Sequence, residues 1–325
     1  MNEQKSGHPG RSLRNKIAAI LAATTAPAFA TMTITPTFTA NFNTNFGANA
    51  AAAQAAWIAA ATTFTSNFND NIHINITVDA VAGTSVFGQS STSLYSTSYA
   101  NLRNLMVADA TSATDATAVG AGGSITVGDP TAGGGIWWVS SAQAKAIGLI
   151  GDNTNNDGTT TFGTGNNFSF SGTPSAGTYD FQGIAAHEIS EVMGRMGLGG
   201  GTIGTYSPSY SLTDIFAWSS AGARDLGNGA GRYFSVDAGS NLLKLYNNSA
   251  SNGLDVVDWA SGTNDAFNQF SSSGVVNPVS SVDLQMMDAI GYNLAPTTAP
   301  EPTPVMVCLL GLGLCITRRP GRAAC

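Results

Sequence analysis

A His-Glu-x-x-Glu run, His187 to Glu191, lies near the middle of the 325-residue chain. It contains the only two glutamates between residues 31 and 299, in a chain whose residues are only 10% charged. On a helix, residues at i and i+4 lie on one face, so His187 and Glu191 would point the same way. The run therefore predicts a helix that presents two ligands to a metal ion.

The residue types of this run suit metal-assisted hydrolysis. A catalytic zinc ion takes three protein ligands and leaves a fourth position for water. His187 would supply a nitrogen ligand and Glu191 an oxygen ligand. Glu188 would take the proton of the water as it attacks a carbonyl, and would later act as the acid.

The third ligand must come from another part of the chain. Asp214, about one loop beyond the predicted helix, is the candidate, although an aspartate before an apolar pair is also a common helix cap. His73 is the only other histidine between residues 31 and 299, and it alternates with isoleucines in a predicted strand. We interpret His73 as a strand-face residue.

A simpler interpretation of the run needs no metal. Such a motif arises often by chance, and Glu191 and Arg195 have the i, i+4 spacing of an exposed ion pair. A pair of that kind stabilises a helix by only about 0.2–0.5 kcal/mol. Against this, both glutamates of the central region fall within one helical turn, beside one of its two histidines. The metal site is therefore the favoured interpretation.

Residues 1–30 have the pattern of a secretion signal. Basic residues precede a short apolar run, Ile17 to Ala26, and Ala28-Phe29-Ala30 is a small-x-small cleavage site. The apolar run is too short to span a bilayer. We expect export of the chain and cleavage after Ala30.

Residues 296–325 form a linker, Pro296 to Pro300, followed by a three-part tail. Pro300-Glu301-Pro302, an apolar segment from Val305 to Ile316 and a basic end resemble the PEP-CTERM sorting signal of Gram-negative bacteria. This resemblance implies export across the inner membrane, transient membrane anchoring, and processing by an exosortase-type enzyme. It also implies a final location in the cell envelope or outside the cell.

The central part of the chain is strongly acidic. Residues 31–299 carry 6 basic and 18 acidic side chains, a net charge of −12, against −7 for the full sequence. This charge argues against binding to nucleic acid or to anionic membranes. The three cysteines, at positions 308, 315 and 325, all lie in the tail, so the central part has no disulfide.

Sequence periodicity predicts a mixture of helices and strands. We expect an extended segment over 31–47 and a strand over 71–78, where apolar and polar residues alternate. Asp180 would cap the helix that carries the motif, and a capping-box spacing at Ser280 and Asp283 begins a terminal helix. The remaining expected elements are helices over 48–64, 99–110 and up to 146, and short strands over 135–139, over 168–170 and after 197.

Several stretches resemble one family. The stretch from Gly177 to Arg195, with Asp214-Ile215-Phe216, Tyr233 to Asp237, Asp255 to Trp259 and Asp283 to Tyr292, is similar to PEP-CTERM-associated bacterial zinc metalloproteases. These are metzincin-like zincins in which a glutamate at the second ligand position is usual.

This resemblance implies an α+β, zincin-like domain over residues 31–295. A twisted mixed sheet would back the active-site helix, with a looser C-terminal subdomain. It implies a zinc endopeptidase in which His187 and Glu191 are ligands and Glu188 is the catalytic base. Gly194 matches the glycine of extended zincin motifs. Those motifs next have a histidine at the position of residue 197, where this chain has a glycine, Gly197. Met286 and Met287 lie in a predicted helix, so we interpret them as core residues.

Calcium is a second candidate cofactor. Asn153-x-Asn155-x-Asp157-Gly158 resembles the start of a calcium loop, but Thr164 stands where the bidentate glutamate belongs. An Asp-Gly hairpin turn is the favoured interpretation. Asp237, Asp255 and Asp258 are further calcium candidates that turn chemistry explains equally well.

The sequence thus predicts an exported zinc endopeptidase that acts on proteins or peptides. Three alternatives stay open. They are a noncatalytic matrix or adhesion protein on a zincin scaffold, a metal hydrolase with a different substrate, and a calcium-stabilised binding module.

Overall fold

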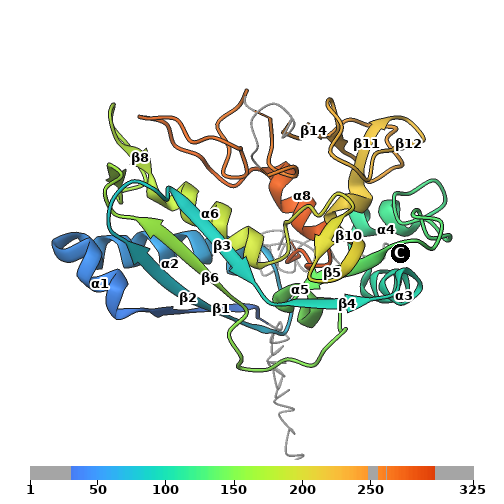
Figure 1. Ribbon diagram of the computed structural model, residues 1–325, viewed down its shortest axis with the longest axis horizontal. Helices are drawn as coiled ribbons and strands as arrows, with labels where there is room; N and C mark the ends of the chain where they lie inside the picture. Colours follow the sequence, from blue (N-terminus) through green and yellow to red (C-terminus); the bar gives the residue numbers. More distant parts are fainter. Residues whose placement is uncertain (1–30, 248–254, 261, 297–325) are drawn as a thin grey trace, which may run out of the picture.

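A computed structural model describes residues 31–247, 255–260 and 262–296 (Figure 1). The predicted secretion signal and the predicted sorting signal lie outside these residues. Within the described ranges, no helix is long and apolar enough to cross a membrane.

The first sheet has the strand order β1-β2-β6-β3. β1 (Thr33–Phe38), β2 (His73–Val81) and β6 (Gly158–Gly163) run parallel to one another. β3 (Gly88–Thr92) runs antiparallel to β6 and forms an edge of the sheet. This edge strand borders the cleft described below.

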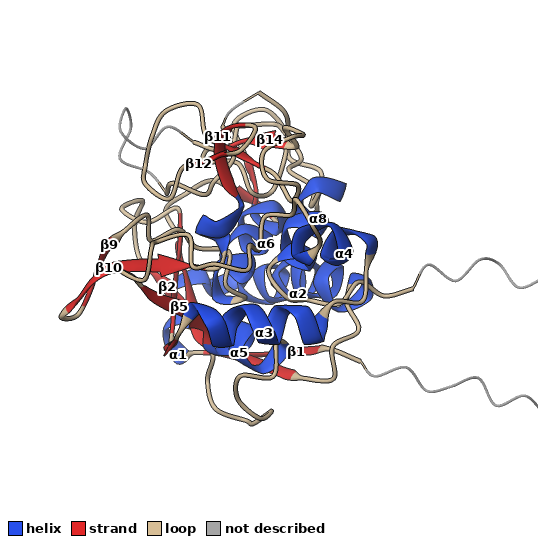
Figure 2. Ribbon diagram, turned by 90° about the vertical axis from the view of Figure 1, so that its right-hand side faces the viewer, coloured by secondary structure: helices blue, strands red, loops and turns tan. Residues whose placement is uncertain are grey.

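Alternation along β2 gives the sheet one apolar face. Ile74, Ile76 and Val78 are buried, and the residues between them are more exposed, as the period of two predicts. Two helices, α2 (Ala50–Asn67) and α6 (Phe181–Val192), pack side by side and contact strands of this sheet (Figures 1 and 2). The predicted strand and both helices are thus confirmed.

α6 is anchored at both ends. Phe181 packs against an aromatic cluster, with ring centroids 4.7 Å from Phe162 and 5.1 Å from Phe168. Asp180 is the N-cap residue, as predicted, but its carboxylate accepts a hydrogen bond from the Asn277 N–H instead of capping the helix. After Val192 the chain turns at Gly194, whose φ of +106° favours glycine.

Two further sheets and a short strand pair complete the structure. The second sheet contains β4 (Leu94–Thr97), β5 (Ile136–Ser140), β10 (Tyr206–Ser211) and β9 (Gly201–Ile203). The third contains β12 (Ala223–Arg224), β11 (Ala217–Ser220), β13 (Tyr233–Phe234) and β14 (Lys244–Leu245). β7 (Phe168–Ser169) pairs with β8 (Tyr179–Asp180).

The remaining helices are short. They are α1 (Ala40–Phe46), α3 (Tyr99–Asp109), α4 (Ala113–Val119), α5 (Ser141–Ala146), α8 (Ser281–Ala289) and 3-10 turns at Gly47–Asn49 and Thr213–Phe216. The described chain is therefore a mixed α+β structure, as predicted.

One expectation about the first segment was wrong. Residues 31–47 are extended only as far as Phe38, and α1 follows. The Thr39 hydroxyl caps α1 by accepting a hydrogen bond from the Phe42 N–H. Phe42 and Phe46, four residues apart, are both buried on one face of the helix. This helical spacing outweighs the local alternation that predicted a strand.

The prediction for the terminal helix is confirmed. Ser280 and Asp283 form both hydrogen bonds of a capping box at the start of α8. Met286 and Met287 are fully buried in α8. They are core residues and do not form a methionine turn.

Candidate metal centre

The motif of α6 places two candidate ligands together. His187 Nε2 lies 3.1 Å from Glu191 Oε1, as the i, i+4 spacing predicts. Both side chains are largely buried, with 15% and 14% of their surface exposed. The prediction that these two groups converge is confirmed.

Asp258 completes the cluster. Its Oδ1 lies 3.4 Å from His187 Nε2. One ligand atom from each of His187, Glu191 and Asp258 can be chosen so that all lie within 4.8 Å of one another. One imidazole nitrogen and two carboxylate oxygens thus meet at one point, a donor set that can hold a divalent metal ion.

The imidazole of His187 has the orientation expected of a metal ligand. Its Nδ1 lies 2.9 Å from the Ala266 carbonyl oxygen, which can only accept a hydrogen bond. Nδ1 therefore carries a proton, and Nε2 is directed at the two carboxylates. Such a contact fixes the ring of a histidine ligand and increases its basicity.

Glu188 lies beside this cluster, on the same side of α6. It is 5% exposed, and its Oε2 has no hydrogen-bond partner within the described residues. A Cβ atom on Gly88 of β3 would collide with Glu188 Oε1. The glycine therefore leaves room for this carboxylate.

All four side chains line one cavity of about 570 Å³. Phe87 and the β3 residues Gly88 to Ser90 line one part of it, and residues of α6 line another. Residues between Asp265 and Asn277 line a third part, and Asp255 lies near Glu191. The cavity is thus a cleft between an edge strand and an irregular segment.

Arg195 lies directly behind the cluster and is fully buried. Its Nη1 is 2.7 Å from Asp258 Oδ1, and its Nη2 is 3.4 Å from Glu191 Oε1. The Glu191–Arg195 pair considered from sequence therefore exists, but it is buried and belongs to the cluster. The Ser90 hydroxyl donates to Glu191 Oε2 at 2.7 Å and ties β3 to α6.

The buried charges shift the pKa values of these groups. Burial lowers the pKa of His187, but the negative charges of Asp258 and Glu191 outweigh this and raise it to about 10. Burial raises the pKa of Glu191, but His187 and Arg195 reduce it to about 2. Burial and the charge of Glu191 raise the pKa of Glu188 well above its usual value. Glu188 is therefore a stronger base than a surface carboxylate.

Asp214 is not part of this cluster, which corrects the predicted third ligand. Its Oδ2 accepts backbone hydrogen bonds from Leu198, Gly199 and Ser211, at 3.1, 3.2 and 2.8 Å. The Ser211 hydroxyl donates to the same oxygen at 3.0 Å, so Asp214 connects the turn after α6 to β10. Asp214 does not cap a helix either, because it lies within the 3-10 turn Thr213–Phe216, whose N-cap residue is Leu212.

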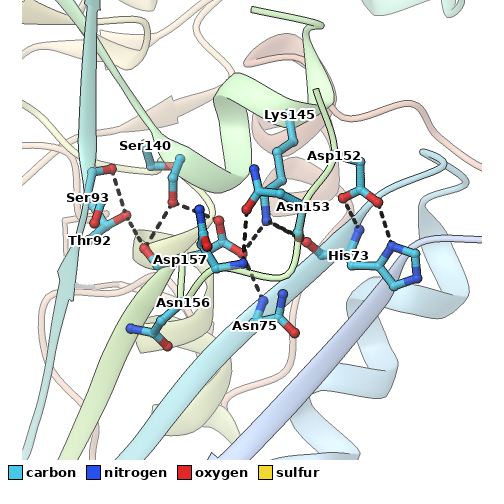
Figure 3. Close-up of polar contacts among 12 residues, drawn as sticks. His73, Asn75, Thr92, Ser93, Ser140, Lys145, Asp152, Asn153, Asn156 and Asp157 are labelled. Atoms are coloured by element: carbon cyan, nitrogen blue, oxygen red, sulfur yellow. Dashed lines mark hydrogen bonds and ion pairs between the residues drawn. The ribbon is translucent and has the colours of Figure 1, made fainter. Parts of the chain in front are cut away.

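The loop that resembles a calcium site instead accepts hydrogen bonds from Lys145, a buried lysine of α5 (Figure 3). The ammonium of Lys145 donates to the carbonyls of His73 and Asn153 and to Asp157 Oδ2, at 2.8, 3.1 and 2.8 Å. The Asp-Gly hairpin turn favoured from the sequence is wrong, because Gly158 begins β6, which pairs with β2 and β3. The oxygens of this loop thus bind a side-chain cation.

The remaining histidine and the further calcium candidates considered from the sequence also have defined places in the structure. His73 lies on the exposed face of β2 and pairs with Asp152 at 2.6 Å, as a strand-face residue would. Asp237 accepts hydrogen bonds from Ser235 and Asn241 within a turn. Asp255 and Asp258 both line the cleft, and Asp258 joins the metal cluster.

Sequence reasoning missed the role of Asp258 and the burial of Arg195. Asp258 was noted among the acidic residues, but its spacing does not distinguish it from other aspartates of the chain. Its position depends on contacts such as the 2.8 Å hydrogen bond from the Trp259 N–H to the Phe267 carbonyl.

Comparisons with protein-family models, curated proteins and solved structures returned no match. The geometry of the cleft is therefore the basis for assigning a function.

Proposed function

We propose that this protein is a zinc-dependent endopeptidase in which Glu188 is the general base. The observation that carries this proposal is the convergence of His187, Glu191 and Asp258 beside Glu188 in one cleft. Three ligands and an adjacent unpaired carboxylate are the components of a hydrolytic metal site.

The donor set fits a zinc ion. Zinc accepts histidine nitrogen and carboxylate oxygen, and a catalytic site needs three protein ligands. The two carboxylates would balance the charge of the ion, and the Ala266 carbonyl would orient His187. A bound zinc ion would supply Lewis-acid activation of a water molecule and of the substrate carbonyl.

Glu188 would carry out the proton transfers. Glu188 lines the cleft next to the ligands, and its Oε2 has no hydrogen-bond partner among the described residues, so the carboxylate can accept the proton of an attacking water. A raised pKa increases its affinity for that proton, and a nearby cation would keep it ionised at neutral pH. The same group would then protonate the leaving amine.

The edge strand β3 would bind the substrate backbone. An edge strand has one side available for pairing, and an extended peptide can add to it as a further strand. Gly88 to Ser90 of β3 line the cleft beside α6, so a peptide paired with β3 would pass close to Glu188. This arrangement favours a peptide substrate over a compact small molecule.

The zincin-like fold and the export route remain part of the proposal. A mixed sheet in contact with the motif helix agrees with the arrangement that the resemblance to zincin metalloproteases implies. The sequence signals at residues 1–30 and 296–325 support an exported enzyme, processed by an exosortase-type partner.

The test is Glu188→Gln in the chain from residue 31 to 299. We expect wild type to bind about one zinc ion and to cleave an unfolded protein. The variant should keep its zinc and lose activity by at least about 100-fold, the usual contribution of a general base. Zinc content is measured by elemental analysis, and cleavage with a fluorescently labelled unfolded protein.

Asp152→Asn is the matched control, because it makes the same chemical change at the surface pair with His73. It should leave zinc content and cleavage unchanged. A wild-type protein that binds zinc without cleaving would support the noncatalytic matrix or adhesion protein. One that binds no zinc and cleaves nothing would end the enzyme hypothesis.

A further inference from the structure

We propose that Arg195 is the positioning residue of the metal centre, holding Glu191 and Asp258 in place so that they form one ligand set with His187. The inference rests on the proposed function, since it concerns how the same site binds zinc. Arg195 itself is not among the residues that line the cleft.

The guanidinium group joins ligands from two different parts of the chain. Its Nη1 donates to Asp258 Oδ1 at 2.7 Å, and its Nη2 lies 3.4 Å from Glu191 Oε1. A guanidinium is planar and has fixed donor directions, so it can set the relative position of two carboxylates. A lysine ammonium would provide charge without this fixed geometry.

The orientation of Asp258 depends on such a contact more than that of Glu191 does. Glu191 is held by a helix, and a helix fixes the direction of its side chains. Asp258 instead lies in an irregular segment just before the isolated bridge at Trp259. A ligand on irregular backbone depends on side-chain contacts for its orientation.

Arg195 is also connected to His187 through two neighbours. Its Nε donates to Ser190 Oγ at 2.8 Å, and that hydroxyl donates to the His187 carbonyl at 2.6 Å. Its guanidinium lies 4.5 Å from the ring centre of Phe267, the residue after Ala266. Since the Ala266 carbonyl orients the imidazole, one buried side chain is linked to all three ligands.

The charge of Arg195 makes the proposal easy to test. A cation this near a metal site repels a metal ion, so a purely electrostatic role predicts tighter zinc binding once the charge is removed. A positioning role predicts weaker binding, because Asp258 is no longer oriented. The two roles thus predict opposite changes in zinc affinity.

We expect Arg195→Met to weaken zinc binding by about 10- to 100-fold, the usual effect of losing an outer contact of a metal ligand. The zinc dissociation constant is measured by competition with a chromophoric chelator, and folding by circular dichroism. Arg195→Lys should also bind zinc more weakly than wild type, because a lysine cannot hold both carboxylates.

Arg224→Met is the matched control. The Arg224 guanidinium stacks on Trp218 at 4.2 Å and donates to the Ile215 and Ser124 carbonyls, away from the ligands. Its loss should lower the melting temperature without changing zinc affinity. A merely structural role for Arg195 would give this same pattern and would overturn the proposal.

Phe267→Leu tests the proposal if Arg195→Met does not fold. It removes the ring under the guanidinium and leaves every charge in place, so we expect a smaller loss of zinc affinity. Unchanged affinity in folded Phe267→Leu and Arg195→Lys, or tighter binding in Arg195→Met, would refute the inference. A wild type without zinc would instead refute the proposed function.

Discussion

The position of the Glu188 carboxylate depends on the absence of a side chain at Gly88. The carboxylate lies against the backbone of β3, where a side chain on residue 88 would occupy the same space. Gly88 does not have a positive φ, so glycine is needed here for space and not for conformation. Gly88 of the edge strand thus determines where the side chain of Glu188, the proposed base, can lie.

We therefore predict that Gly88→Ala reduces cleavage by about 100-fold, because displacing a catalytic group by about 1 Å can have this effect. The obstructing atom is the end of a flexible side chain, so the unfolding free energy should change by less than about 1 kcal/mol. Zinc content should not change. The measurements are kcat, bound zinc and urea denaturation.

Ser91→Ala on the same strand is the control, since Ser91 is exposed and outside the cleft lining. Full activity in Gly88→Ala would show that Glu188 does not need its observed position.

Lys145 and Asp157 join α5, β2 and the start of β6 (Figure 3). Both side chains are at most 1% exposed. Asp157 also accepts hydrogen bonds from the Asn75 N–H and the Ser141 hydroxyl, at 2.8 and 2.7 Å. This ion pair fixes the connection between the sheet and the helix that follows β5.

Lys145→Met should lower the unfolding free energy by about 3–5 kcal/mol, because it leaves the Asp157 carboxylate buried without its cation. The double variant Lys145→Met/Asp157→Asn should recover part of the loss, since it removes the unpaired charge. Urea denaturation measures both effects. A loss below about 1 kcal/mol would mean that the pair behaves as a surface ion pair.

A group of aspartates surrounds Asn293 where the ends of the described domain meet. Asn293 Nδ2 lies 3.3 Å from Asp70 Oδ1 and 3.2 Å from Asp109 Oδ1. Asp115 and Asp288 are close enough to repel Asp109. Burial raises the pKa of Asp109 to about 7, opposed by the hydrogen bond from Asn293 and assisted by repulsion from Asp70, Asp115 and Asp288. Burial likewise raises the pKa of Asp70 to about 6.

These raised values predict how stability changes with pH. Between about pH 4 and 7 the folded protein binds more protons at these groups than the unfolded chain does, so their contribution to stability falls as pH rises. Asp109→Asn removes the largest of these effects. We expect the variant to lose less stability than wild type between pH 5 and pH 8, as measured by the urea midpoint at each pH.

Asp152→Asn serves as control here: burial raises the pKa of Asp152, but its hydrogen bonds and charge interaction with His73 together lower it below its ordinary value, and so below this range. If wild type and Asp109→Asn show the same change in midpoint between the two pH values, Asp109 is ionised throughout.

Local patterns in the sequence were sufficient for much of the fold. The alternation of β2, the length of α2 and the capping box of α8 each depend on residues within one or two turns. The segment over α1 shows the limit of such patterns, because alternation and the spacing of Phe42 and Phe46 predict different structures. Burial of both rings decides between them, because Phe42 packs against Phe38 and Phe46 packs against Phe181.

The residues of the candidate site likewise fall into two groups, those that the local sequence predicts and those that it does not. His187, Glu188 and Glu191 follow from the sequence because one helical turn places them together. Asp214 and Asp258 are both aspartates before apolar residues, and nothing local separates them. Backbone donors bind Asp214 after α6, whereas Arg195 and the Trp259–Phe267 contact bring Asp258 to His187. The position of the third candidate ligand depends on contacts between distant segments, and only the tertiary structure supplies these.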